Sequence, residues 1–163
     1  MSIKDGLLAE YDHEIATTRK LLERIPDVKL SWKPHDKSRS LGGLATHLAN
    51  LPGWTDTILN KLSFDMAAMP PAASELTSTA EILQAFDTIA VRARTWMDRT
   101  DAEYNAPWTL KRDEQVMFTI PRIAAFRSWV LGHLVHHRGQ LSVYLRLNDL
   151  PVPAIYGPSA DEG

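Results

Sequence analysis

Cysteine is missing from the 163-residue sequence, and this absence excludes several kinds of site. There can be no disulfide, no thiolate metal ligand and no cysteine nucleophile, so any metal ion would have to be bound through nitrogen or oxygen. The N-terminal stretch, MSIKDGLLAEYDHE, also lacks the long apolar run that a signal peptide or a membrane span requires. We therefore expect a cytoplasmic protein that does not enter a membrane.

A surplus of charge of one sign is missing as well. The 18 basic residues are balanced by 20 acidic residues, which gives a formal net charge of -2, and the basic residues are scattered along the chain. Nucleic acid is not an expected partner, because its binding needs a basic patch or stripe. Glycine is sparse, with eight residues, whereas hydrophobic residues make up 44% of the sequence. This composition and length are typical of one globular helical domain, which we expect to span residues 1–163.

Four segments carry apolar residues at steps of three and four, which is the pattern of amphipathic helices. They span residues 3–25, 41–58, 78–99 and 121–148. Ser2 is the expected N-cap of the first segment, and Ser78 with Glu81 three positions later predicts a capping box for the third. Pro52 should bend or divide the second segment, and Pro121 suits the first turn of the fourth.

The connections between these segments differ in character. Residues 31–40 and 63–77 are polar or rich in proline, which is typical of loops. Residues 101–120 contain the stretches WTLKR and QVMFTI around a charged pair, which fits either an irregular hairpin or a long loop. The proline-rich tail from residue 149 onward cannot be helical, and we expect Ile155 and Tyr156 to dock it onto the helices. The predicted fold is an all-α four-helix bundle with a long irregular connection before the last helix.

Three of the six histidines lie where the helical pattern predicts buried side chains. His133 and His137, in the run LGHLVHHRGQ, are four residues apart and share one helix face, where side chains are about 5–6 Å apart. His47 lies in an apolar stripe of the second helix, between Leu44 and Leu51. Buried imidazoles need partners, and one cation bound to all three would satisfy them. The sequence therefore predicts a three-histidine metal site with a position left open for water or substrate.

Residues close to this site leave several alternatives open. Each histidine could instead be a hydrogen-bonded core residue. His136 is a competing ligand, although its place beside the stripe favours a position at the rim. Arg138 and Gln140 could orient the ligands or hold an anion, but a solvated helix face is the expected place for Arg138. Trp54 and Trp129 are the tryptophans that we expect nearest to the site.

Other polar residues are weaker candidates. Glu10 or Asp12 of the first helix could supply a carboxylate near the ion, although no spacing requires it. We expect His13 and His35 to have surface or structural roles. Ser31, Ser38 and Ser40 have no fixed base beside them in the sequence, so a serine nucleophile has no support.

Three segments of the sequence resemble the DinB family of damage-inducible proteins, which are four-helix-bundle metalloproteins grouped with bacterial thiol transferases. These segments are LGHLVHHRGQL, SWKPHDKSRSLGGLATHLANL and PVPAIYGPSADE. The resemblance implies an up-down-down-up bundle, frequent homodimers and a metal bound by His47, His133 and His137. The ion implied is one divalent transition metal, with nickel or zinc foremost and iron or manganese as alternatives. The resemblance fixes no activity.

The leading functional hypothesis is a metal-dependent enzyme that activates water or a small thiol, for hydrolysis or S-transfer on a small molecule. Three neutral ligands leave the charge of the ion at +2, which favours an anionic nucleophile over redox chemistry. Arg39 or Arg138 could then hold the carboxylate of a thiol. The alternative is a non-catalytic, stress-responsive metal-binding protein. A third hypothesis is a structural domain whose histidines form hydrogen bonds in the core.

Overall fold

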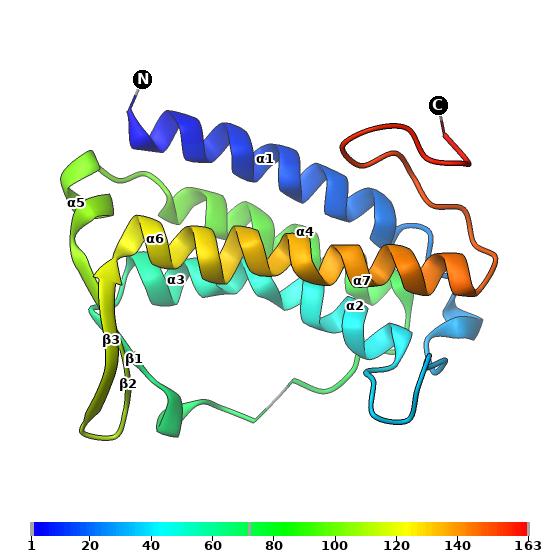
Figure 1. Cartoon of the computed structure of the whole chain (residues 1–163), viewed down its shortest axis with the longest axis horizontal. Helices are drawn as coiled ribbons and strands as arrows, with labels where there is room; N and C mark the ends of the chain where they lie inside the picture. Colours follow the sequence, from blue (N-terminus) through cyan, green and yellow to red (C-terminus); the bar gives the residue numbers. More distant parts are fainter. Residues whose placement is uncertain (1, 72, 163) are drawn as a thin grey trace.

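The computed structural model describes residues 2–71 and 73–162, and its framework is a bundle of four helical arms (Figure 1). The arms are α1 (Ile3–Leu22), α2 (Leu41–Asn50) with α3 (Trp54–Leu59), α4 (Thr79–Trp96), and α6 (Arg122–Phe126) with α7 (His133–Leu147). In Figure 1, α1 and the α6–α7 arm run in one direction, and the α2–α3 arm and α4 run in the opposite direction. Both α1 and α2 pack against α4 and α7. This is the up-down-down-up arrangement that the family resemblance implies.

Two of the arms contain an irregular turn. The 3₁₀ turn η2 (Leu51–Gly53) separates α2 from α3 at Pro52, where the sequence predicted a bend. The π-helical segment η4 (Arg127–Gly132) joins α6 to α7 and ends directly before His133. Such π-helical turns are rare and occur frequently at functional sites. Within the described residues, none of the helices has the length and apolar character needed to cross a membrane.

The predicted N-caps are present, although one of them differs in detail. Ser2 and Asp5 form a complete capping box at the start of α1. At α4 the Ser78 hydroxyl accepts a hydrogen bond from the Glu81 N–H at 3.2 Å, but the Glu81 carboxylate accepts from the backbone and hydroxyl of Thr77. The capping box predicted for Ser78 and Glu81 is therefore only half formed, because the residue before the cap competes for the carboxylate.

A small sheet stands beside the bundle, so the prediction of an all-α fold is wrong in this part. The strands are β1 (Ser63–Asp65), β2 (Pro107–Arg112) and β3 (Gln115–Pro121). The order is β1-β2-β3, with β1 parallel to β2 and β2 antiparallel to β3. Of the two alternatives for residues 101–120, the hairpin is confirmed, and the short helix α5 (Asp101–Asn105) precedes it.

The two ends of the hairpin explain where the sequence-based prediction was wrong. At the turn, Asp113 adopts φ 52°, and its N–H donates to the Asp65 carboxylate at 3.0 Å. This bond ties the hairpin to β1, a contact between distant segments that local periodicity cannot reveal. At the other end Pro121 pairs with Pro107 and is extended, so α6 begins after Pro121 and does not contain it in its first turn.

The core divides into two clusters along the bundle. One lies among α1, α2, α4 and α7 and includes the buried leucines Leu44, Leu48 and Leu134, which neighbour the candidate histidines in the sequence. The other lies where the sheet meets the bundle and includes Trp108 and Phe126. Burying one side chain of this size contributes about 1.5–3 kcal/mol. The helices that carry the histidines are therefore held by packed core on their inner sides.

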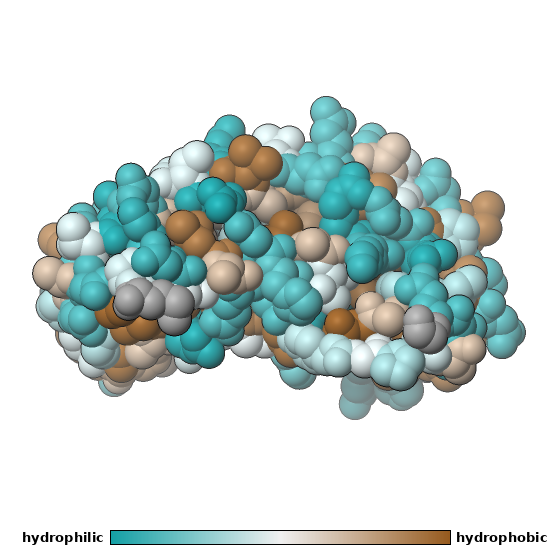
Figure 2. Space-filling model, turned by 90° about the horizontal axis from the view of Figure 1, so that it is seen from above, coloured by the Kyte–Doolittle hydropathy of each residue, from teal (hydrophilic) through white to brown (hydrophobic). Residues whose placement is uncertain are grey.

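The C-terminal tail lies against α1, on the face seen in Figure 2. Residues 150–162 form no helix, as predicted, and Ile155 packs onto the core. The Tyr156 hydroxyl donates to the Glu14 carboxylate of α1, 2.9 Å away. On this face the hydrophobic residues lie as separate patches among hydrophilic ones, so it offers no continuous apolar surface.

Candidate metal centre

Three imidazoles meet between α2 and α7. His47 comes from α2, and His133 and His137 come from consecutive turns of α7. Their possible ligand atoms all lie within 4.8 Å of one another, and the Nε2 atoms of His47 and His133 are 3.3 Å apart. All three residues are half-buried. The structure therefore brings together the three histidines that the sequence placed on inward faces.

The spacing of these atoms fits the ligand shell of a metal ion. Zinc–imidazole bonds are about 2.0–2.1 Å long, so two nitrogens of a tetrahedral site lie about 3.3–3.4 Å apart. The Nε2 atoms of His47 and His133 already have this separation. The ring centroid of His137 is 4.5 Å from that of His47 and 4.7 Å from that of His133. With all the possible ligand atoms within 4.8 Å of one another, the three residues fit a divalent metal ion.

The local environment keeps these imidazoles neutral. Burial, together with the charges of His137, Arg39 and His133, lowers the pKa of His47 to about 4. Burial is also the main cause that lowers the pKa values of His133 and His137. Only a neutral imidazole can bind a metal, so the lowered pKa values favour the metal-binding form at neutral pH.

Gln140 fixes the orientation of His137. The Nδ1–H of His137 donates to the Gln140 side-chain oxygen at 2.7 Å, which leaves Nε2 of His137 free as a ligand atom. The Gln140 amide nitrogen lies 3.2 Å from Nε2 of His136 and donates to it. His136 is exposed beside the cluster and is not one of its three members. An outer hydrogen bond of this kind orients a metal ligand and raises its basicity.

A groove of about 480 Å³ opens beside the histidines along η4 and α7. It is lined by Ser128, Trp129, Gly132, His133 and His136. Trp129 lines this groove together with His133, and Trp54 packs against Trp129 with 5.5 Å between the ring centroids. Because His133 lines the groove, a small molecule bound there would contact one of the candidate ligands. No pattern in the sequence pointed to Ser128 or Gly132, which belong to the groove only through their positions in the fold.

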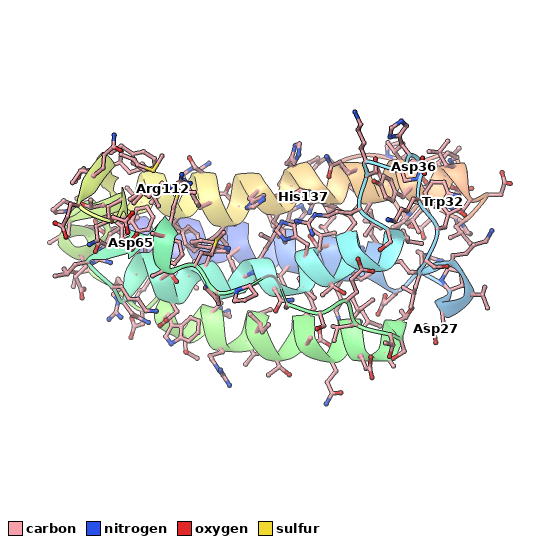
Figure 3. The ribbon with its side chains drawn as sticks, turned by 90° about the horizontal axis from the view of Figure 1, so that it is seen from below. Asp27, Trp32, Asp36, Asp65, Arg112 and His137 are labelled. Carbon is pink, nitrogen blue, oxygen red and sulfur yellow. The ribbon has the colours of Figure 1, made fainter. Side chains whose placement is uncertain are left out.

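Figure 3 looks onto the face on which His137 is accessible. His137 lies in the middle of this face, between Arg112 of the hairpin on one side and Asp36 of the loop before α2 on the other. The same loop continues to Arg39. After burial, the positive charge of Arg39 is one of the causes that lower the pKa values of all three clustered histidines. Of the two arginines considered for binding an anion, Arg39 is therefore the one whose charge acts on the cluster.

Arg138 lies on another side of α7 and is buried, so the expectation of a solvated arginine is wrong. Its side chain is 1% exposed, and its Nη1 lies 2.6 Å from the Glu14 carboxylate of α1. It also donates to the Tyr156 hydroxyl at 2.6 Å. The physical reason is periodicity, because Arg138 continues the buried stripe of Leu134 and Leu141. Arg138 thus joins α7 to α1 and the tail instead of serving the histidines.

The weaker candidates lie elsewhere. Glu10 and Asp12 form ion pairs with arginines at 2.7 and 2.8 Å, and neither carboxylate belongs to the three-histidine group found among the described residues. His13 stacks on Tyr156 with a centroid separation of 6.2 Å, and His35 lies in an exposed loop. These two histidines have surface positions.

Comparison with known sequences gives one family and one curated relative. A model of the DinB family matches residues 1–163. The Bacillus subtilis (strain 168) protein named "Uncharacterized protein YrdA" is 28% identical over 163 residues, which covers 97% of this chain and 90% of that protein. Its name assigns no activity.

Comparison with solved structures gives the same fold. A DinB-like protein from Bacillus cereus ATCC 10987 matches with a TM-score of 0.71 and 22% identity, over 95% of this chain and 98% of that one. YfiT from Bacillus subtilis matches with a TM-score of 0.69 and 16% identity, over 90% of this chain and 87% of that one. YfiT is described as a probable metal-dependent hydrolase with an unusual four-helix bundle topology. At these identities the likeness shows the fold alone.

Proposed function

The chain belongs to the DinB family, and from that premise we propose that it is a metal-dependent enzyme whose ion is bound by His47, His133 and His137. The ion is one divalent transition metal, with nickel or zinc foremost. The nucleophile is water or a low-molecular-weight thiol, and the reaction is hydrolysis or S-transfer on a small molecule. The observation that carries the proposal is the meeting of three imidazoles, from two helices, with ligand atoms within 4.8 Å of one another.

The chemistry follows from the charge of the ligands. A divalent ion held by three neutral imidazoles keeps its charge and lowers the pKa of water or a thiol at an open position. Within the described residues no carboxylate belongs to the ligand group, so the ligands do not reduce this charge. Gln140 holds Nδ1 of His137 at 2.7 Å, and the groove along His133 gives a small molecule access.

Water is the simpler of the two nucleophiles. YfiT, which shares the fold, is described as a probable metal-dependent hydrolase, and this supports hydrolysis as the first reaction to measure. A thiol would also need recognition of the rest of its molecule. Arg39, whose charge acts on all three histidines, is the residue we assign to that recognition.

Elemental analysis of the protein purified without a histidine tag tests the site directly. We expect about one equivalent of a transition metal, because three imidazoles and an open position make one site. His47→Ala and His133→Ala should each lose the metal. His13→Ala is the matched control, because His13 lies outside the cluster and stacks on Tyr156. Circular dichroism should show that all three variants remain helical.

Two assays then separate the proposed reactions. Hydrolysis of 4-nitrophenyl acetate reports activation of water, and conjugation of cysteine to 1-chloro-2,4-dinitrobenzene reports activation of a thiol. Activity should disappear with a chelator and return with zinc or nickel. Metal that is absent from the unmodified protein, or retained in both site variants, would contradict the site. A bound metal with no turnover in either assay would favour the non-catalytic metal-binding protein instead.

A further inference from the structure

Four side chains form one stripe along η4 and α7. Trp129, His133, His137 and Tyr144 are separated by four, four and seven residues, which are the steps that return to one helix face. At 1.5 Å per residue the stripe is about 22 Å long. The two candidate ligands lie between its ends. A molecule centred on them would extend toward Trp129 in one direction and toward Tyr144 in the other.

The Trp129 end of the stripe is apolar. The Trp129 ring lies 5.5 Å from that of Trp54 and 6.4 Å from that of Phe118. The groove of about 480 Å³ lies beside this end and is lined by Trp129, Gly132 and His133 among others. This volume is within the range of small-molecule pockets. Trp129 supplies the aromatic surface of the groove. The groove therefore suits an apolar part of a ligand.

The loop that carries Arg39 lies against the Tyr144 end of the stripe. The Tyr144 hydroxyl donates to the Arg39 carbonyl at 3.4 Å, so the loop that precedes α2 lies against this end of α7. Ser40 caps α2, and His47 follows it by two helical turns, which is a rise of about 10 Å. The long side chain of Arg39 starts one residue before this cap and can cover much of that distance.

The Arg39 guanidinium is available to bind an anion. Over residues 2–71 and 73–162, the only hydrogen bond of Arg39 is made by its backbone carbonyl, so its guanidinium forms no hydrogen bond and no ion pair there. The nearby carboxylate of Glu75 is bonded to the Ser40 hydroxyl at 2.7 Å, at the start of α2. A planar guanidinium can donate two parallel hydrogen bonds to a carboxylate, which an ammonium cannot do.

We propose that the substrate is an elongated small molecule with an apolar group at one end, held in the Trp129 groove, and a carboxylate at the other end, held by Arg39. This inference rests on the proposed function, because it places the reacting bond over the histidines between the two ends. N-Acyl amino acids and thiol adducts with a free carboxylate have this chemistry. The two ends are recognised by residues that do not bind the metal, so their roles can be measured without turnover.

Two probes that differ only in charge test the carboxylate end. N-(4-phenylbutanoyl)glycine carries the carboxylate, and N-(4-phenylbutanoyl)glycinamide has a neutral amide in its place. Isothermal titration calorimetry measures the affinity of the whole protein for each probe, after chelator treatment and again after loading with zinc. The chelator-treated sample separates a carboxylate bound by Arg39 from one bound by the ion. We expect this sample to bind the acid about 10–100-fold more tightly than the amide.

Three variants assign the preference to particular residues. Arg39→Gln should abolish it and leave the affinity for the amide unchanged, whereas Arg39→Lys should keep only part of it. Arg92→Gln is the matched control, because Arg92 is an exposed arginine of α4, and it should behave like the unmodified protein. Ser128→Phe fills the groove from an exposed position and leaves Trp129 in place. It should weaken both phenylbutanoyl probes and leave N-acetylglycine unaffected.

Several outcomes would overturn this inference. Equal affinity of the chelator-treated protein for acid and amide would remove the role of Arg39, and so would equal losses in Arg39→Gln and Arg92→Gln. Unchanged affinity in Ser128→Phe would remove the role of the groove. A protein that retains its metal but does not discriminate between the probes keeps the proposed function and loses this inference. A protein that discriminates between the probes but does not retain metal keeps this inference and loses the proposed function.

Discussion

The buried pair of Arg138 and Glu14 offers a sharp test of how α1, α7 and the tail are held together. The two side chains are 1% and 8% exposed, and the charged atoms are 2.6 Å apart. Arg138→Met keeps most of the length and apolar stem but leaves the Glu14 carboxylate buried without its partner. Breaking a buried pair from one side costs about 3–5 kcal/mol. We expect the free energy of unfolding to fall by about this amount.

The size of this loss has a specific physical origin. It comes from the unpaired buried charge and not from the attraction within the pair, because desolvation offsets most of that attraction. Arg138→Met combined with Glu14→Leu removes both charges and should therefore recover most of the lost stability. The Tyr156 hydroxyl, which donates to Glu14 at 2.9 Å, remains in the single variant and favours the lower end of the range.

Urea unfolding followed by far-UV circular dichroism measures each free energy. Arg94→Met is the control, because Arg94 pairs with Asp12 at 2.8 Å but the two side chains are 52% and 47% exposed. Exposed pairs contribute about 0–1 kcal/mol, so the control should lose little. The reasoning is refuted if Arg138→Met costs no more than this control. It is also refuted if the double variant is no more stable than Arg138→Met alone.

Three further predictions concern the histidines and the end of α3. Gln140→Leu should weaken metal binding about 10–100-fold, measured by competition with a chelator, because Nδ1 of His137 loses its acceptor. In chelator-treated protein, the free energy of unfolding should rise with pH between about 4 and 6.5. In this range His47 binds a proton in the unfolded chain but stays neutral in the folded protein, where it is partly buried. Allowing for partial exposure, the gain from His47 should be about 1–2 kcal/mol in urea unfolding at a series of pH values. His47→Leu should remove this part, while the contributions of His133 and His137 remain. Arg122→Met leaves the Ile58 carbonyl without its buried donor and should cost about 1–3 kcal/mol in the same assay.

Helical periodicity predicted the histidine cluster because the positions of its members are local consequences of the sequence. His133 and His137 share a face of α7 through their four-residue spacing, and His47 shares a face of α2 with Leu44 and Leu48. In a four-helix bundle, inward faces of neighbouring helices must meet. The sequence could therefore predict that these side chains come together, but their role as metal ligands stays a prediction.

The buried ion pair was missed although the same periodicity contains it. Arg138 continues the stripe of Leu134 and Leu141, and Glu14 lies three residues after the buried Tyr11. A charged residue within an apolar stripe needs a partner of opposite charge. One acid and one base in such stripes of two helices therefore predict a buried pair. Composition alone, which treats Arg138 as a solvated residue, gives the wrong answer.

Contacts between distant segments had no local signal. The three residues of β1 are too few for a periodic pattern, and they become a strand only because β2 lies beside them. The placement of Arg39 depends in the same way on a loop that reaches Tyr144, a contact across 105 residues of sequence. Both features are set by tertiary packing, so a single sequence cannot supply them.

The π-helical segment η4 connects the packing of the core to the direction of the histidines. In a straight α-helix, the eight steps from Phe126 to Leu134 would turn the chain through about 800°, so the two side chains would point about 80° apart. The wider π-helical turn accommodates about one extra residue, so the segment turns as if it had about seven α-helical steps. The side chains of Phe126 and Leu134 then point within about 20° of each other. Both Phe126 and Leu134 are fully buried, as this correction requires. Because His133 directly precedes Leu134, the same turn that aligns the core also determines the direction in which His133 meets His47.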